Sequence, residues 1–92
     1  MTPEHAEAIA LQAFAFLARE DDLLMRFANL SGILPNDMRQ AAGEPGFLTG
    51  ILDFFLSHEP DLLALAEAET IAPEQIATAR MVLNPADMSG FE

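Results

Sequence analysis

The segment "FLTGILDFFL", residues 47–56, is the longest apolar stretch in the chain. Drawn as a helix, it carries apolar side chains on nearly every face, and only Thr49, Asp53 and Ser57 form a polar stripe at helical spacing. A helix of this kind belongs in the interior of a small protein. The sequence therefore predicts a central helix over about residues 46–57.

Cap and turn residues predict five more helices around this central one. Thr2 is a suitable N-cap, Gly32 ends an amphipathic segment, and Pro35 and Pro73 each fit a first helical turn. The segment "GEPG", residues 43–46, is the strongest loop signal and divides the chain into two halves. The expected helices outside the centre cover residues 3–19, 21–31, 35–42, 60–68 and 73–83, and residues 84–92 are expected to form an extended, flexible tail.

The two halves, about residues 3–42 and 46–83, repeat the same pattern. They align at a displacement of thirty-nine positions up to Gly32 and of thirty-eight positions after it, so that Pro35 falls on Pro73. Amphipathic helices do not require this match of prolines, which favours an internal duplication over a coincidence of helical pattern. The sequence predicts two pseudo-repeated units of three helices, with one residue deleted at Gly32.

The expected fold class is all-α, a compact bundle of five to six short helices in a single domain over residues 1–92. A chain of this length has room for one core, and 51% hydrophobic residues are enough to form it. One three-helix unit cannot bury its apolar face alone, so the two units are expected to share that core. The residues expected in it are Leu17, Leu23, Leu24, Phe27, Phe47, Ile51, Leu52, Phe54, Phe55, Leu62, Leu63 and Ile76.

The charge of the chain limits its partners. There are 15 acidic residues against 4 basic ones, a formal net charge of −11, and the basic residues are Arg19, Arg26, Arg39 and Arg80. Nucleic acids and anionic membranes require clustered cations, so both are disfavoured as partners, whereas a basic protein is permitted. The N-terminal segment is acidic where a secretory signal would be positive, and no apolar stretch is long enough to span a bilayer. We therefore expect a cytoplasmic protein.

Residues 21–42 suggest an alternative function, a helix-turn-helix DNA-binding regulator. Ala28 lies four residues before Gly32, a spacing that this motif uses around its turn. The candidate reading helix carries one cation among its polar residues, which are Asn36, Asp37, Arg39 and Gln40. A hairpin of two helices with Gly32 as the C-cap explains the same residues.

Residues that carry chemistry are sparse. There is no cysteine, and His5 and His58 lie far apart without a second histidine one helical turn away, so no metal site or cofactor is expected. The serines lack the glycines of a nucleophile elbow, and no glycine-rich phosphate loop is present. The chain is therefore not expected to be an enzyme, and an unrecognised type of enzyme stays a third alternative.

Two features favour a non-catalytic protein–protein interaction module. Glu67 and Glu69 lie near a helix C-terminus, where acids oppose the helix dipole, and with Glu74 they form a candidate acidic surface for an unidentified, basic protein partner. The central helix is apolar on so many sides that it is expected to leave an exposed patch, and such a patch would support a homodimer.

Several short segments, taken in their order along the chain, resemble a known family. They are the Gly32–Ile33 turn with Pro35, the "PGFL" and "ILDFFL" segments of the central helix, and the "APEQI" turn at residues 72–76. This order resembles the small all-helical bacterial proteins grouped as domain of unknown function 3572, over about residues 13–83. The resemblance implies an all-helical fold, no known activity and no catalytic residues.

Overall fold

The computed structural model describes residues 1–83, and the regular elements within that range are all helices. The all-α fold class, with five to six short helices, is confirmed for this part of the chain. The tail expected over residues 84–92 lies outside the described residues. In chain order the elements are α1 Pro3–Arg19, α2 Asp21–Ser31, the 3-10 helix η1 Pro35–Asp37, α3 Met38–Ala41, α4 Pro45–Leu56, α5 Glu59–Glu69 and α6 Pro73–Leu83.

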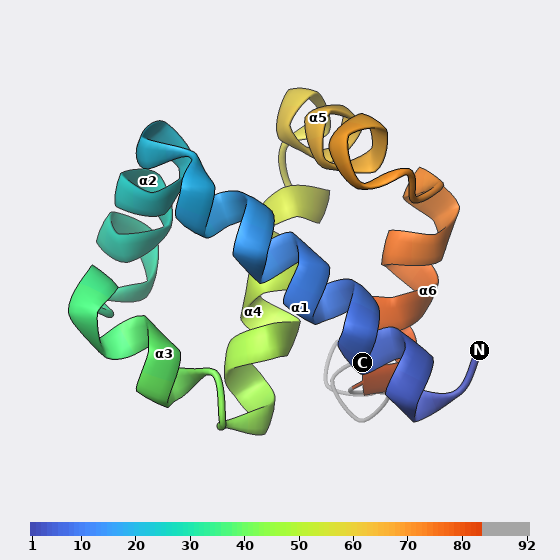
Figure 1. The fold of residues 1–92 in the computed structure, drawn as a ribbon, viewed down its shortest axis with the longest axis horizontal. Coiled ribbons are helices and arrows are strands. Elements are labelled where there is room, and N and C mark those ends of the chain that lie inside the picture. The colour runs from blue at the N-terminus through green and yellow to red at the C-terminus, as the bar shows by residue number, and fades with distance from the viewer. Residues whose placement is uncertain (84–92) are drawn as a thin grey trace, which may run out of the picture.

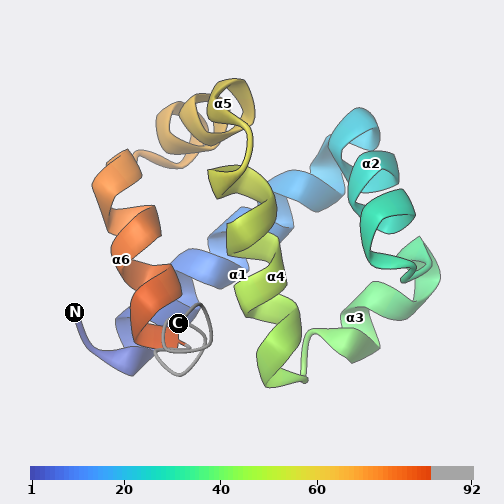
Figure 2. The same ribbon diagram turned by 180° about the vertical axis from the view of Figure 1, so that it is seen from behind.

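Helices α1 and α4 cross at the centre of the molecule. Figures 1 and 2 show α2 and α3 on one side of this pair and α5 and α6 on the other. Helix α6 packs extensively against both central helices, whereas α3 packs mainly against η1, the turn in front of it. The bundle is therefore closed on the α5–α6 side and more open on the α2–α3 side.

Local signals set the helix ends as the sequence predicts. The Thr2 hydroxyl accepts a hydrogen bond from the backbone N–H of His5 at 3.1 Å, which caps the start of α1. Gly32 ends α2 in the left-handed conformation, with φ of 77°, and its N–H donates to the carbonyl of Ala28 at 2.9 Å. Helices α4 and α5 each begin one residue before their expected starts, at Pro45 and Glu59.

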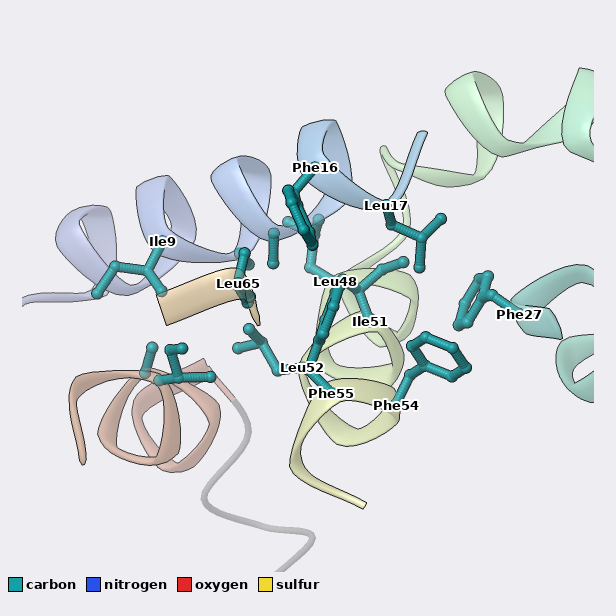
Figure 3. Close-up of a cluster of buried hydrophobic side chains, with 14 of the residues drawn as sticks. Ile9, Phe16, Leu17, Phe27, Leu48, Ile51, Leu52, Phe54, Phe55 and Leu65 are labelled. Carbon is teal, nitrogen blue, oxygen red and sulfur yellow. The ribbon is translucent and has the colours of Figure 1, made fainter. Parts of the chain in front are cut away.

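The side chains of α4 form the centre of the core, as Figure 3 shows. The apolar residues expected there are buried, and Thr49 is buried with them, so it does not extend the polar stripe. The Phe27 ring of α2 packs edge-on against Phe47 and Phe54 of α4, with ring centroids 5.7 and 5.5 Å apart. These aromatic contacts hold α2 against α4. The predicted core residues that are buried are Leu17, Leu23, Phe27, Phe47, Ile51, Leu52, Phe54, Phe55 and Ile76.

Three predicted core positions were wrong or only partly right. Leu63 is 50% exposed, and Leu24 and Leu62 are half-buried at the edge of the core. In α5 the fully buried residue is Leu65, which was not among the predicted core residues. The predicted core positions of α5 came from the displacement of thirty-nine positions, which pairs Leu24 with Leu63. This pairing compares each residue of α5 with the α2 residue one position too early, so it predicts the wrong face of α5 to be buried.

Helices α2 and α5 correspond at a displacement of thirty-eight positions, as do the starts of η1 and α6, whereas α1 and α4 differ in length. At that displacement Ser31 corresponds to Glu69, and Gly32 corresponds to Thr70, which also has a left-handed backbone. The buried Phe27 then corresponds to the buried Leu65. Helices α2 and α5 thus both have 11 residues and end in the same backbone conformation, and duplication of the two halves with one residue deleted at Gly32 stays a prediction.

Candidate binding groove

Arg80 and Arg26 form ion pairs that connect α4 and α5 to neighbouring helices. Arg80 of α6 donates to both carboxylate oxygens of Asp53 on α4, at 2.6 and 3.1 Å. Arg26 of α2 donates to Asp61 of α5 at 3.0 Å, and its guanidinium lies 5.6 Å from the centroid of the Phe54 ring. The hydrogen bond to Asp61 raises the pKa of Arg26 above its ordinary value. Both guanidinium groups are thus engaged within the chain.

The candidate acidic surface predicted from sequence lies along α5 and the first turn of α6. Glu67 and Glu74 are exposed there. Glu69 is partly buried and forms an ion pair with Arg19 of α1, with an N–O distance of 2.9 Å. This pair gives Glu69 a structural partner inside the chain, so the acidic side chains that this face offers to another molecule are chiefly Glu67 and Glu74.

An apolar groove lies between α2, the η1–α3 segment and α4, on the open side of the bundle. It consists of two adjoining hollows of about 440 and 550 Å³ that share Ile33, Gly46 and Phe47. We call it the α2–α4 groove and define it by its lining residues. Its walls are Phe27, Leu30, Ser31, Ile33, Asp37, Gln40 and Ala41 on one side, and Glu44, Gly46, Phe47, Gly50, Asp53, Phe54 and Ser57 on the other.

Two glycines form the α4 side of this groove. Gly46 and Gly50 are one helical turn apart, and a Cβ atom placed on either would meet no atom within 4 Å beyond its chain neighbours and the nearby backbone of its own helix. Gly50 lies inside the helix, where glycine is less stable than alanine by roughly 0.5–1 kcal/mol. No close packing within the described chain requires glycine at these positions, so they leave room that a side chain would otherwise fill.

Exposed leucines border the groove. Leu30 lines it and is 77% exposed, and Leu34, the residue after Ile33, is 66% exposed. The apolar residues of α4, by contrast, are largely covered by the chain itself. The most exposed large apolar side chains of the described residues are therefore Leu30 and Leu34, on α2 and the turn that follows it, and not on the central helix.

The predicted turn markers lie at the ends of short connections. Gly32 and Pro35 flank the connection from α2 to η1, and Pro73 begins α6. Gly32 lies between the groove residues Ser31 and Ile33, whereas Pro73 belongs to α6, which Figure 1 shows on the other side of the α1–α4 pair. The segment that would read DNA consists of one 3-10 turn and the four residues of α3, which is a short and interrupted helix.

The two hydroxyl groups of the groove are hydrogen-bonded to the backbone nearby. The Ser57 hydroxyl donates to the carbonyl of Phe54 at 2.9 Å, and the Ser31 hydroxyl accepts from the N–H of Ile33 at 3.1 Å. Neither hydroxyl is hydrogen-bonded to a side chain that could act as a base. Across residues 1–83, no three His, Asp or Glu side chains gather closely enough to hold a metal ion.

Comparison with known proteins places the chain in a family. The model of a family described as "Protein of unknown function (DUF3572)" matches residues 3–86. The chain belongs to the DUF3572 family. The resemblance identified from sequence is thereby confirmed, and membership of DUF3572 assigns no activity. No curated protein and no solved structure gives a significant match.

In this DUF3572 protein, none of the described helices has the length and apolarity needed to cross a membrane.

Sequence reasoning identified the glycine turn and the central helix but missed the groove between them. Gly46 and Gly50 were the available signal, because glycines one turn apart inside an otherwise apolar helix indicate that something approaches that face closely.

Proposed function

We propose that this protein is a non-catalytic protein-interaction module whose α2–α4 groove receives an apolar segment of a protein partner. The observation that carries the proposal is the groove itself, which has apolar walls and two glycines along α4 with open space above them. A contiguous exposed apolar patch on a protein surface generally marks an interaction site. Leu30 and Leu34 extend this surface beyond the groove.

The groove supports binding better than catalysis. An active site brings a nucleophile, a base and an orienting group into hydrogen-bonding distance. Within the described residues, the side-chain hydrogen bonds between different helices are the arginine–carboxylate pairs, and the groove serines are bound to the backbone. These pairs stabilise the arrangement of the helices, which supports a binding role for the groove over a catalytic one.

The groove also supports protein binding better than DNA binding. Arg39 is the one arginine outside the ion pairs described above, and the groove is lined by acids with no cation among them. Affinity for DNA comes largely from cations that replace the counterions of the phosphates. The helix-turn-helix function of residues 21–42 therefore stays an alternative without a supporting observation.

The proposal is tested by affinity capture from an extract of the native cells, followed by mass spectrometry of the retained proteins. Three baits are compared. They are the wild-type protein, the Gly50→Gln variant, which extends a side chain into the groove, and a Glu67→Gln/Glu74→Gln variant, which is a control on the other face. A protein retained by the wild type and the control, but lost with Gly50→Gln, supports the proposal. Retention of nothing, or retention that Gly50→Gln does not change, overturns it.

A further inference from the structure

We infer that the occupant of the α2–α4 groove is an amphipathic helix from another protein, with Lys or Arg residues beside its apolar face. This inference rests on the proposed function above and names the kind of partner. Three observations carry it: the glycines of α4, the signs of the charges around the groove, and the pairing of most arginines with acids inside this chain.

The dimensions of the groove fit a helix. Along α4 it runs from Gly46 to Ser57, a distance of about 16 Å, which is close to three turns of a second helix lying alongside. The missing Cβ atoms of Gly46 and Gly50 allow a helix backbone to approach α4 closely, as small residues one turn apart do at helix–helix contacts. The apolar face of the arriving helix would contact Phe27, Phe47 and Leu30.

The charges around the groove favour a basic partner. The charged residues that line it are Asp37, Glu44 and Asp53, all of them acids. Asp37 and Glu44 are exposed, and the Asp53 side chain remains 51% exposed although it binds Arg80. A helix with cations flanking its apolar stripe would place positive charge against this rim, which raises the association rate and fixes the orientation.

The same charges disfavour a second copy of this chain as the occupant. Each copy carries a net charge of −11, so two copies repel one another. Arg19, Arg26 and Arg80 are already paired with acids inside the chain. Arg39 is the one arginine outside these pairs, so a second copy offers the rim fewer cations than a basic helix from a different protein would.

The test uses a fluorescent synthetic peptide of about 16 residues, enough to span the groove as a helix, with a Leu and Ala face flanked by Lys. Two comparison peptides carry Glu in place of Lys, or one Pro at the centre that breaks the helix. Binding to the full-length protein is measured by fluorescence anisotropy, and the site is mapped by amide chemical-shift changes in ¹⁵N spectra.

We expect the Lys peptide to bind and to shift the amides of Ile33, Gly46 and Gly50. Both comparison peptides should bind at least about tenfold more weakly. Gly50→Gln should weaken the Lys peptide by a similar factor, and Glu67→Gln/Glu74→Gln should not.

The inference is overturned by equal binding of the Glu or Pro peptide, or by no binding of the Lys peptide. It is also overturned if Gly50→Gln leaves the affinity for the Lys peptide unchanged and the amide chemical-shift changes are spread over the whole acidic surface. Either result would leave the proposed function standing if native capture still depended on Gly50. Loss of that dependence would overturn the proposed function itself.

Discussion

Gly32 and Thr70 end α2 and α5 in the same left-handed backbone conformation, with φ of 77° and 55°. In each case the N–H of the cap residue donates to the carbonyl four residues earlier, Ala28 for Gly32 and Ala66 for Thr70. Glycine adopts this conformation without a steric penalty, whereas a residue with a Cβ atom pays roughly 1–2 kcal/mol. The second half of the chain therefore uses the same turn as the first half with a less suitable residue.

Replacing this residue should stabilise the protein. Thr70→Gly removes the steric cost, and we expect the free energy of unfolding to rise by about 1 kcal/mol, which corresponds to about 4–8 °C in Tm for a domain of this size. Thermal unfolding followed by circular dichroism measures the shift. Thr70→Ala keeps the Cβ atom and should give no comparable gain, and an equal gain from both variants would count against a strained Thr70.

Leu63 and Leu65 provide a matched pair on α5. Leu65→Ala should lower the free energy of unfolding by about 2–5 kcal/mol, because it removes a fully buried side chain from the core. Leu63→Ala should change it by less than about 0.5 kcal/mol, because that side chain is half exposed. Urea unfolding of the two variants measures the difference, and a larger cost for Leu63 would mean that α5 is rotated from its position in the structure.

Gly50→Ala should separate stability from binding. Alanine inside α4 meets open space, so the variant should be more stable by about 0.5–1 kcal/mol in chemical denaturation. The added methyl group narrows the groove, so the same variant should bind the Lys peptide more weakly. Gly32→Ala is the control, and it should be less stable than the wild type because its φ is positive. Tighter binding by Gly50→Ala would contradict the role of Gly50 in the groove.

The arginine pairs should differ in strength according to their burial. Arg80→Gln breaks a two-point interaction made by a nearly buried guanidinium, and we expect it to cost about 1.5–3 kcal/mol. Arg19→Gln breaks a pair whose arginine is largely exposed, so its cost should stay below about 1 kcal/mol. Urea unfolding at low and high salt compares the two. An equal loss of unfolding free energy from Arg19→Gln and Arg80→Gln would show that the burial of the arginine does not determine the strength of the ion pair.

Much of the fold could be predicted from single residues with a local effect. Thr2, Gly32 and Pro73 fix helix ends through capping and backbone geometry, which depend on neighbours in sequence. The burial of α4 followed from its composition. The rotation of α5 could not be read in the same way, because Leu62, Leu63 and Leu65 are equally apolar and only tertiary packing selects among them.

The groove could be predicted only in part. Gly46 and Gly50 were visible in sequence, but their use depends on α3 being short and lying away from α4, which follows from the packing of the whole bundle. The pairing of Glu69 with Arg19 was likewise hidden, because these residues are fifty positions apart in sequence. Interactions of this kind depend on the arrangement of helices, so a local pattern does not reveal them.

Helix α5 is attached to the bundle differently from the other helices. Leu65 is its one fully covered side chain, and the ion pairs of Asp61 and Glu69 join it to α2 and α1. Because α5 has fewer buried side chains than α1, its amide hydrogens should exchange through local opening sooner than those of α1, and faster as salt screens the ion pairs. The closed side of the bundle can therefore loosen while α1 and α4 remain folded.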